Sequence, residues 1–446
     1  MHKLRRFSTF ICICLSLCGL LSCAHSSSSF KKTSRDLISD VVNIPQVPRV
    51  LLEGIALKER SEPLVLQKTF HENMYGIWHR SEISTTVADL QSDVLKLKGS
   101  YGEDLLKRPD SWLESQVENS NWSQLGVLKR AGIIVETADL RKLPTIFPCF
   151  ADPDAPGEGF PFDYLQETQL YLGRPILISH FSKDGKWVFV ESSVDGRGWI
   201  RASKFGFVSK RDIERVEKLP LATVAADDIS IQDQDGHISD HLKLGTVLPL
   251  KRKSGPYAYL SIPILLDHQK IVFRECKVDS SQVLDQPLSW KRSNIQYALD
   301  QLIGKPYGWG NLLGNRDCSG MIRDFYTLFH ILLPPSSMRI PDYGRVIDLS
   351  LKSREEKRAI LEKEGIPFRT VLYKKGHVGI YIGQWKQMLL MFHSPWGVKT
   401  QSENQEGRNL IGKSVVSTLE YGKDLPYFNE QNGNFLKELT KIVLLE

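Results

Sequence analysis

The feature that most constrains the fold of this chain is a cysteine that opens an amphipathic helix. Cys318 lies in a glycine- and aromatic-rich stretch, residues 304–329, and Asp317 before it is a residue type that favours the start of a helix. The apolar residues that follow have the spacing of one buried helical face: Met321, Ile322, Phe325, Leu328 and Phe329. A thiol in the first helical turn lies near free backbone N–H groups and the positive end of the helix dipole, so we expect its pKa to fall below the ordinary value of about 8.5.

Two histidines lie in a predicted β-hairpin further along the chain. The run GHVGIYIG alternates, which places His377 on one strand face, and the run MLLMFH returns and ends at His393. If residues 383–387 form the turn, His377 lies directly opposite His393. Directly opposed side chains have Cβ atoms about 4.5–5.5 Å apart, so we expect the two rings to be in contact.

These three residues suffice for acyl transfer. We expect Cys318 to be the nucleophile, His377 the general base and acid, and His393 the group that fixes the tautomer of His377. Two other interpretations are open. A lone cysteine is often an inert buried residue, and all three could bind zinc, although no fourth ligand follows at metal-binding spacing. We therefore predict neither a metal nor a cofactor.

The length of the chain limits the number of domains, and its net charge limits the kinds of partner. The chain has 446 residues, which suggests about three folded units. Its formal charge is +6, and +3 remains once Lys3, Arg5 and Arg6 are removed with a leader. We expect no nucleic-acid partner at that charge.

The N-terminus reads as an export signal. The three basic residues precede an apolar run, residues 7–21, of secretory-signal length. The end of the run, Leu20-Leu21-Ser22-Cys23, resembles the bacterial lipobox, which implies a signal peptide over residues 1–22 and lipidation at Cys23. Ala24 in the next position implies a periplasmic protein anchored to the outer membrane. An ordinary cleaved signal or a buried helix are the alternatives.

Four of the seven cysteines remain after that cleavage. Cys23 and Cys318 have assigned roles, and Cys149 and Cys276 could form a disulfide, which the sequence leaves open. So few cysteines do not make a disulfide scaffold, so we expect ordinary hydrophobic cores.

The rest of the chain divides into segments that differ in composition and in residue pattern. Residues 23–49 begin small and polar and should be a tether, and residues 50–143 are mostly helical in pattern. A Pro-, Gly- and Asp-rich stretch opens residues 144–220, which continue with short β-rich runs that resemble bacterial SH3 domains. Residues 221–285 look like a second, degenerate copy, and residues 286–446 hold the cysteine and both histidines.

The three blocks YGWG, DCSG and GHVGIYIG, followed by Phe392-His393-Ser394, resemble the NlpC-type cell-wall cysteine peptidases. The resemblance covers about residues 290–446 and implies an α+β, papain-like catalytic domain. Together with the helical segment and the two SH3-like β-barrels, the chain is similar to γ-D-glutamyl-L-diamino acid endopeptidases. Those enzymes act on peptides with a free N-terminal L-Ala.

That resemblance implies a set of substrate contacts. Tyr307 corresponds to a groove tyrosine, Asp317 to the carboxylate that meets the L-Ala ammonium, and Ser319 to a contact beside it. Asp342 is a second candidate, although its segment lacks the arginine of the family pattern and has Tyr343 in place of a small hydroxyl residue. Glu167 and Trp199 are the candidates from the first barrel.

The sequence thus predicts a lipid-anchored, monomeric hydrolase of peptidoglycan stem peptides that cleaves the γ-D-Glu to diamino-acid bond through a thioester. The alternatives are another Cys-His amidase or acyltransferase of the cell wall, and a non-catalytic wall-binding lipoprotein. A barrel loop that closes one end of the Cys318 groove would favour short free peptides as substrates.

Overall fold

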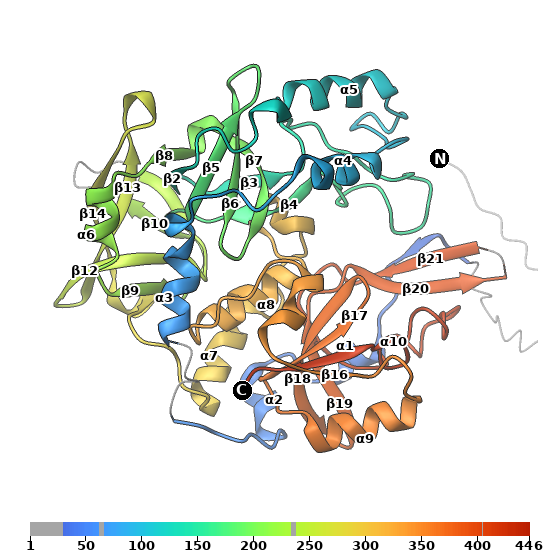
Figure 1. Ribbon diagram of the computed structural model, residues 1–446. Coiled ribbons are helices and arrows are strands. Elements are labelled where there is room, and N and C mark those ends of the chain that lie inside the picture. Colours follow the sequence, from blue (N-terminus) through green and yellow to red (C-terminus); the bar gives the residue numbers. More distant parts are fainter. Residues whose placement is uncertain (1–29, 62–66, 233–237, 404) are drawn as a thin grey trace, which may run out of the picture. The chain divides into compact units, whose positions relative to one another are not determined.

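The computed structural model describes residues 30–61, 67–232, 238–403 and 405–446 (Figure 1). The leader and Cys23 lie outside the described residues, so export and lipidation stay predictions. None of the described helices is both long and apolar enough to cross a membrane. Residues 31–446 form one unit by their contacts.

The segment before the first barrel is helical, as predicted, but its helices are short. Gly99 and Pro109 separate two of them: α4 ends at Leu95, and α5 begins directly after Pro109. Thr86 caps α4 through a capping box with Asp89. The helices are α2 (Pro48–Glu53), α3 (Gln67–Tyr75), α4 (Val87–Leu95) and α5 (Asp110–Asn119), with 3-10 turns η1 (Gly76–His79) and η2 (Trp122–Gln124).

The first barrel is a seven-stranded sheet in the order β4-β3-β7-β6-β5-β2-β8. Its strands are β2 (Arg130–Ile134), β3 (Ala138–Arg141), β4 (Gln166–Leu170), β5 (Pro175–Phe181), β6 (Trp187–Ser192), β7 (Gly196–Arg201) and β8 (Phe205–Phe207), with turn η3 (Ala202–Lys204). Four of them coincide with the β-rich runs in the sequence. The sheet starts at Arg130, so it includes residues before 144 that the sequence analysis assigned to the helical segment.

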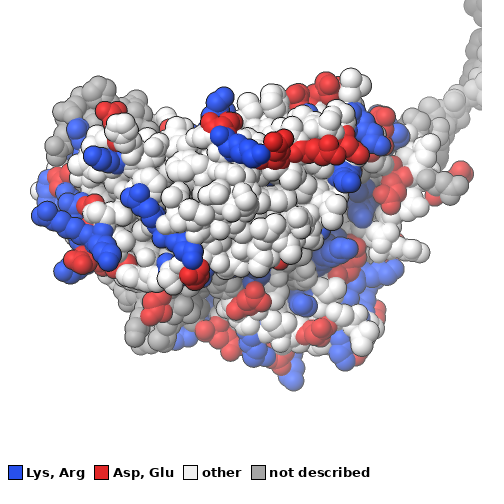
Figure 2. Space-filling view, turned by 45° about the horizontal axis from the view of Figure 1, so that its top comes forward, with Lys and Arg blue, Asp and Glu red and all other residues white. Residues whose placement is uncertain are grey.

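The second barrel follows α6 (Lys210–Val216) and has a five-stranded sheet in the order β14-β13-β12-β9-β15 beside the hairpin β10–β11. Basic side chains gather on this side of the molecule, at the left of Figure 2. Cys276 is buried in this barrel's core, whereas Cys149 is buried in another cluster, so no disulfide joins the two. The elements are β9 (Leu221–Val224), β10 (Ile229–Gln232), β11 (Ile238–Leu242), β12 (Val247–Ser254), β13 (Tyr257–Leu265), η4 (Asp267–Gln269), β14 (Ile271–Asp279), η5 (Ser280–Gln282) and β15 (Val283–Leu284).

The C-terminal domain packs α8 against a six-stranded sheet in the order β16-β23-β17-β18-β19-β22. The predicted apolar face of α8 is buried in one core with Val378 and Ile380 of β18. The elements are α7 (Arg292–Leu302), η6 (Trp309–Gly314), α8 (Cys318–Thr327), η7 (Ser337–Tyr343), β16 (Arg345–Asp348), α9 (Arg354–Glu364), β17 (Thr370–Lys374), β18 (His377–Trp385), β19 (Met388–His393), β20 (Gly397–Ser402), β21 (Gln405–Leu410), β22 (Val415–Thr418), α10 (Phe435–Glu438) and β23 (Lys441–Leu444).

The predicted tether is only partly a tether, because its second half packs on the C-terminal domain. β1 (Thr33–Ser34) pairs in parallel with β21, which itself pairs with β20. The short helix α1 (Ser39–Asn43) lies against β22, and the side chain of Gln46 exchanges two hydrogen bonds, of 2.8 and 2.9 Å, with the backbone of Val416. The described residues of this segment, from Lys31 on, therefore belong to the same unit as the C-terminal domain.

A buried ion network joins α8 to the second barrel. The Arg316 guanidinium makes two bonds, of 2.6 and 2.8 Å, to the Asp227 carboxylate and a third, of 2.6 Å, to Asp324 of α8. All three side chains are at most 7% exposed. Burial alone would raise the pKa of Asp227, but Arg316 outweighs it and lowers the pKa to about 2. This contribution to stability is complete above about pH 4 and is lost as the pH falls towards 2.

The same network reaches the first barrel. Arg323 of α8 binds Asp324 at 2.8 Å and the backbone carbonyl of Gln169 at 3.3 Å. The Tyr171 hydroxyl donates to Asp324 at 2.9 Å. Three buried arginines and three buried aspartates are thus neutralised together, since Arg174 and Asp195 of the barrel pair at 3.0 Å beside Arg323. The helix that begins at Cys318 is fixed to both barrels by charge-assisted hydrogen bonds.

We predict that Arg316→Met lowers the free energy of unfolding by about 3–5 kcal/mol, because it leaves the carboxylates of Asp227 and Asp324 buried without their shared cation. Urea denaturation followed by tryptophan fluorescence measures the change. Arg358→Met is the control, since that arginine pairs with Glu362 on an exposed helix face and should shift the midpoint far less. Equal shifts for the two variants would contradict the central role of the network.

Candidate active site

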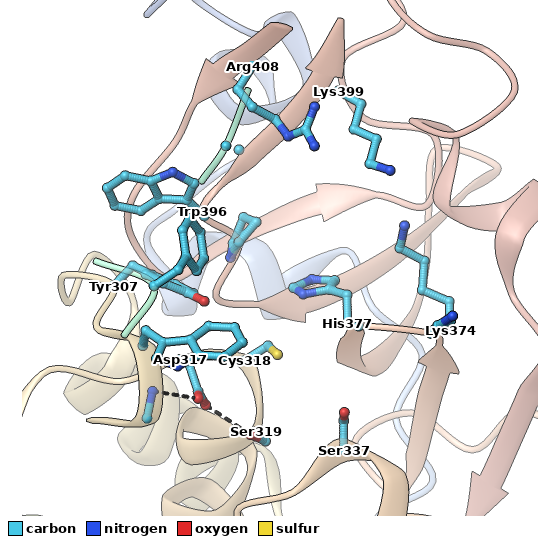
Figure 3. A pocket seen from close by; sticks show the side chains of 18 of the residues that line it. Tyr307, Asp317, Cys318, Ser319, Ser337, Lys374, His377, Trp396, Lys399 and Arg408 are labelled. Atoms are coloured by element: carbon cyan, nitrogen blue, oxygen red, sulfur yellow. Dashed lines mark hydrogen bonds between the residues drawn. The ribbon is translucent and has the colours of Figure 1, made fainter. Parts of the chain in front are cut away.

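Asp317 caps α8 and fixes the loop that leads to Cys318. Its carboxylate accepts hydrogen bonds from the backbone N–H groups of Gly320 at 2.7 Å and Gly310 at 3.1 Å, and from the Ser319 hydroxyl at 2.9 Å (Figure 3). The predicted N-cap is confirmed. Two carboxylate oxygens offer about four acceptor positions, so this carboxylate keeps capacity for one further donor.

The two histidines are in contact, as predicted, but the predicted register is wrong. Nε2 of His377 lies 2.8 Å from Nδ1 of His393. The hairpin turns on the two residues Lys386 and Gln387, because Trp385 pairs with Met388, and Ile380 pairs with Phe392. This register places Gly379, rather than His377, across from His393.

Gly379 makes the diagonal contact of the two rings possible. A Cβ atom at this position would lie 3.3 Å from Cβ of His393 and 3.2 Å from the sulfur of Met391. His377 is two residues away on the same strand face, from which a ring can still reach a diagonal neighbour. A larger residue at position 379 would crowd His393.

A hydrogen-bond chain behind His393 fixes the tautomers of both rings. The Ser417 hydroxyl donates to the carbonyl of Thr418 at 2.9 Å, so its oxygen accepts from Nε2–H of His393, also at 2.9 Å. Nδ1 of His393 then carries a lone pair and accepts from Nε2–H of His377. The remaining ring nitrogen of His377, Nδ1, is left as the free base.

Cys318 lies at the floor of a pocket, and its thiol is not pre-ionised. Burial, together with the neighbouring Asp317 carboxylate, raises the pKa of Cys318 to about 12, although the backbone N–H groups of Val378 and Ser319 act in the opposite direction. The expectation of a lowered pKa is therefore wrong: the helix N-terminus acts on this thiol, but desolvation outweighs it.

Both histidines are neutral in the resting site. Burial, together with the nearby Lys374 ammonium, lowers the pKa of His377 to about 3. Burial and the adjacent His377 ring hold the pKa of His393 well below its usual range. A neutral thiol beside a neutral imidazole calls for proton transfer during attack, rather than a preformed ion pair.

The pocket over Cys318 has a volume of about 530 Å³ and is built by the C-terminal domain and the first barrel together. Figure 3 shows the sulfur of Cys318 and the ring of His377 in the same space, with Tyr307 and Asp317 on one side. Barrel residues close part of the rim: Lys142, Gly157, Phe162, Gln166 and Glu167. The Gln166 amide also donates to the carbonyl of Gly310 at 3.1 Å, which ties strand β4 to the loop before Cys318.

An aromatic cluster forms one wall. Phe162, from the Pro- and Gly-rich loop at 148–165, packs edge-on against Trp309 at 5.3 Å and Trp396 at 5.7 Å between ring centroids. Tyr307 lies 5.5 Å from Trp396 in the same cluster. The loop is therefore a wall of the pocket.

Four of the six predicted substrate contacts line the pocket, and two do not. Tyr307, Asp317, Ser319 and Glu167 line it, and Glu167 pairs with Lys142 at 3.0 Å. Trp199 is wholly buried in the barrel, packed against Phe189, so its assignment as a substrate contact is wrong. Asp342 is exposed and outside the pocket, and its segment contributes only residues 336–338 to the lining.

Ser417, which is buried and bonded to His393, and several pocket residues were not found from the sequence. Ser417 comes from β22, about a hundred residues after Cys318, with no motif around it. The others are Lys374, Trp396, Lys399, Arg408 and Tyr421. The sequence gives basic side chains in a strand no reason to face a pocket rather than solvent. The position of Lys374, Lys399 and Arg408 is therefore visible only in the folded structure. Among the described residues, no group of three or more His, Cys, Asp or Glu could hold a metal ion.

The raised pKa of Cys318 predicts slow alkylation at acidic pH. A pKa near 12 means that the thiolate fraction, and with it the rate of reaction with iodoacetamide, rises through pH 6–9 without a plateau. Peptide mapping by mass spectrometry follows Cys318, with the buried Cys149 and Cys276 as internal controls. A fast, pH-independent rate at pH 5–6 would instead mean a thiolate–imidazolium pair.

Comparisons with known families match four parts of the chain. The NlpC/P60 family model matches residues 304–412, and a model described as the NLPC_P60 stabilising domain, N term, matches residues 9–124. An SH3 domain of SH3b1 type matches residues 148–201, and one of SH3b2 type matches residues 209–254. The comparison with curated proteins gave no match.

One solved structure shares the fold over most of the chain. The chain is similar to an NlpC/P60 endopeptidase from Photobacterium damselae subsp. piscicida, with 23% identity and a TM-score of 0.79 over 93% of this chain and 99% of that one. An NlpC/P60 family protein from Bacillus cereus ATCC 10987 matches at 16% identity and a TM-score of 0.44, over 70% of this chain and 98% of that one. The chain therefore combines an NlpC/P60 domain with an N-terminal stabilising domain of that family and two bacterial SH3 domains.

Proposed function

We propose that this protein is a cysteine peptidase that hydrolyses the amide between γ-D-Glu and the diamino acid of peptidoglycan stem peptides. The NlpC/P60 domain supports a cell-wall peptidase. The observation that carries the proposal is the pocket in which Cys318 lies between His377, bonded to His393, and the carboxylate of Asp317.

The proposed reaction uses the tautomers set by the hydrogen-bond chain. Nδ1 of His377 takes the thiol proton as Sγ of Cys318 attacks the amide carbonyl. The oxyanion lies near the first backbone N–H groups of α8. The imidazolium of His377 then protonates the leaving amine, which leaves a thioester on Cys318. Water, deprotonated by the same nitrogen, hydrolyses the thioester and restores the thiol.

We propose that His393 orients His377 and stays hydrogen-bonded to Ser417 throughout. When His377 becomes charged, its Nε2–H donates more strongly to Nδ1 of His393, which the Ser417 hydroxyl keeps unprotonated. A neutral orienting group stabilises the imidazolium less than a carboxylate would, which agrees with the neutral resting state.

A free N-terminal L-Ala is the second part of the proposal. Asp317 has one acceptor position left in a half-buried site, and Tyr307 and Glu167 line the same pocket. Phe162 and Trp309, which pack edge-on at 5.3 Å, line this pocket as well. This supports short stem peptides with a free amino terminus as substrates.

The N-terminal sequence also supports export of the protein. We propose that the basic N-terminus and the lipobox direct export to the periplasm and lipidation at Cys23. The lipid at Cys23 would anchor the protein to the outer membrane of a Gram-negative cell.

Asp317→Asn tests the recognition of the amino terminus without removing the helix cap, since Asn caps helices about as well as Asp. The unaltered protein should cleave L-Ala-γ-D-Glu-diaminopimelate and reject its N-acetyl form. The variant should lose roughly 100-fold in kcat/KM on the free peptide, because a desolvated charge pair is worth about 2–5 kcal/mol, while its low activity on the acetylated peptide should change little. Liquid chromatography with mass spectrometry identifies the bond that is cleaved.

Cys318→Ala is the control for the chemistry and should abolish cleavage of both peptides. Persisting cleavage by this variant would overturn the mechanism. Cleavage at a different bond would favour another Cys-His amidase of the cell wall. Equal cleavage of free and acetylated peptides by the unaltered protein would contradict the role of Asp317.

A further inference from the structure

Two cations face each other across the hairpin β20–β21 on the rim of the Cys318 pocket. Lys399 and Arg408 are directly paired in the register of the two strands, and both side chains line the pocket (Figure 3). Directly opposed like charges destabilise a strand pair unless an anion lies between them. Their position therefore calls for a negative group.

The protein itself supplies little negative charge to these two residues. The side chain of Arg408 is 17% exposed, and among the residues that the structure describes the only carboxylate within ion-pair distance is Glu406, at 3.9 Å. The Glu158 carboxylate is also near, but it accepts from the Tyr164 hydroxyl at 2.8 Å. Burial lowers the pKa of Arg408 more than these two carboxylates raise it.

The positive charge of Lys399 has even less negative charge near it. It is half-buried, and within the described parts of the chain no carboxylate lies within 4.0 Å of its ammonium. Two other lysines of the pocket do have a carboxylate partner. Lys142 pairs with Glu167 at 3.0 Å, and Lys374 pairs with Glu438. The β20–β21 side thus holds two directly opposed cations, neither with a carboxylate closer than 3.9 Å among the described residues, while Lys375 lines the pocket as an exposed side chain beside Lys374.

This side lies away from the position proposed for the substrate's amino terminus. Figure 3 shows Lys399 and Arg408 at the top of the view, and Asp317 and Cys318 next to each other below them, with Trp396 and Tyr307 along one side. In the proposed function the ammonium of the substrate binds at Asp317 and the scissile carbonyl lies at Cys318. The cations then face the part of the substrate on the other side of the scissile bond, which is the diamino acid.

We propose that Lys399 and Arg408 form a carboxylate-binding subsite for the leaving diamino acid, and that they select a diamino acid with a carboxylate at the end of its side chain. meso-Diaminopimelate carries that carboxylate, whereas L-lysine ends in an ammonium alone, which the two cations would repel. The inference rests on the proposed function and names the substrate class within it.

The test compares two peptides that differ only in this group, L-Ala-γ-D-Glu-meso-diaminopimelate and L-Ala-γ-D-Glu-L-Lys. We expect the unaltered protein to prefer the first by at least about 10-fold in kcat/KM, the equivalent of about 1.4 kcal/mol. The double variant Lys399→Gln/Arg408→Gln should reduce this ratio to near 1, mainly by losing activity on the diaminopimelate peptide. Thermal unfolding checks that the variant is folded, which we expect because the substitutions remove a repulsion.

Lys363→Gln is the matched control, since it removes one positive charge from α9 at a side chain that is 82% exposed, and it should keep the ratio of the unaltered protein. An unaltered protein that cleaves both peptides equally, or a double variant that keeps the ratio, would overturn the subsite while leaving the proposed function intact. Cleavage of neither peptide by the unaltered protein would overturn the proposed function, and the subsite with it.

Discussion

The position of Cys318 depends on the buried ion network that starts two residues before it. Arg316 joins Asp227 of the second barrel to Asp324 of α8, and Arg323 extends the contacts to the first barrel. The backbone carbonyl of Arg316 also accepts from the Ser394 hydroxyl at 3.1 Å, next to His393. Arg316 therefore connects the cysteine helix, the histidine strand and the second barrel, and Arg323 completes the connection to the first barrel. Removing one charge from such a network leaves others unpaired in a dry interior, so the barrels and the catalytic domain should lose stability together.

The chemistry of the pocket follows from burial more than from formal charge. Desolvation keeps Cys318 protonated and both histidines neutral, and the hydroxyl of Ser417 selects which ring nitrogen of His377 is free. Charge is placed instead elsewhere in the pocket, with a carboxylate at Asp317 and two opposed cations at Lys399 and Arg408. A substrate that carries an ammonium at one end and carboxylates at the other would complement both. The central site then has to supply only orientation and a proton acceptor.

Local signals predicted the parts of the site that depend on local structure. The start and the buried face of α8 follow from the Asp317 cap and from apolar spacing, and both were predicted correctly. The hairpin register was wrong because the chain turns at Lys386 and Gln387, both with positive φ, where the usual turn signals Asn and Gly are missing. Trp199 and Asp342 were misplaced, and Ser417 was missed, because their positions depend on packing between distant segments. The thiol pKa was misjudged for the same reason, since burial cannot be read from a helix start.

The most direct test of the proposed thioester is to weigh the protein during turnover. Rapid mixing with L-Ala-γ-D-Glu-diaminopimelate, acid quenching and intact-protein mass spectrometry should show an adduct with the mass of the L-Ala-γ-D-Glu acyl group, mapped by digestion to Cys318. The Cys318→Ala variant should show none. Turnover without any adduct on Cys318 across the quench times, or an adduct that contains the diamino acid, would contradict the account.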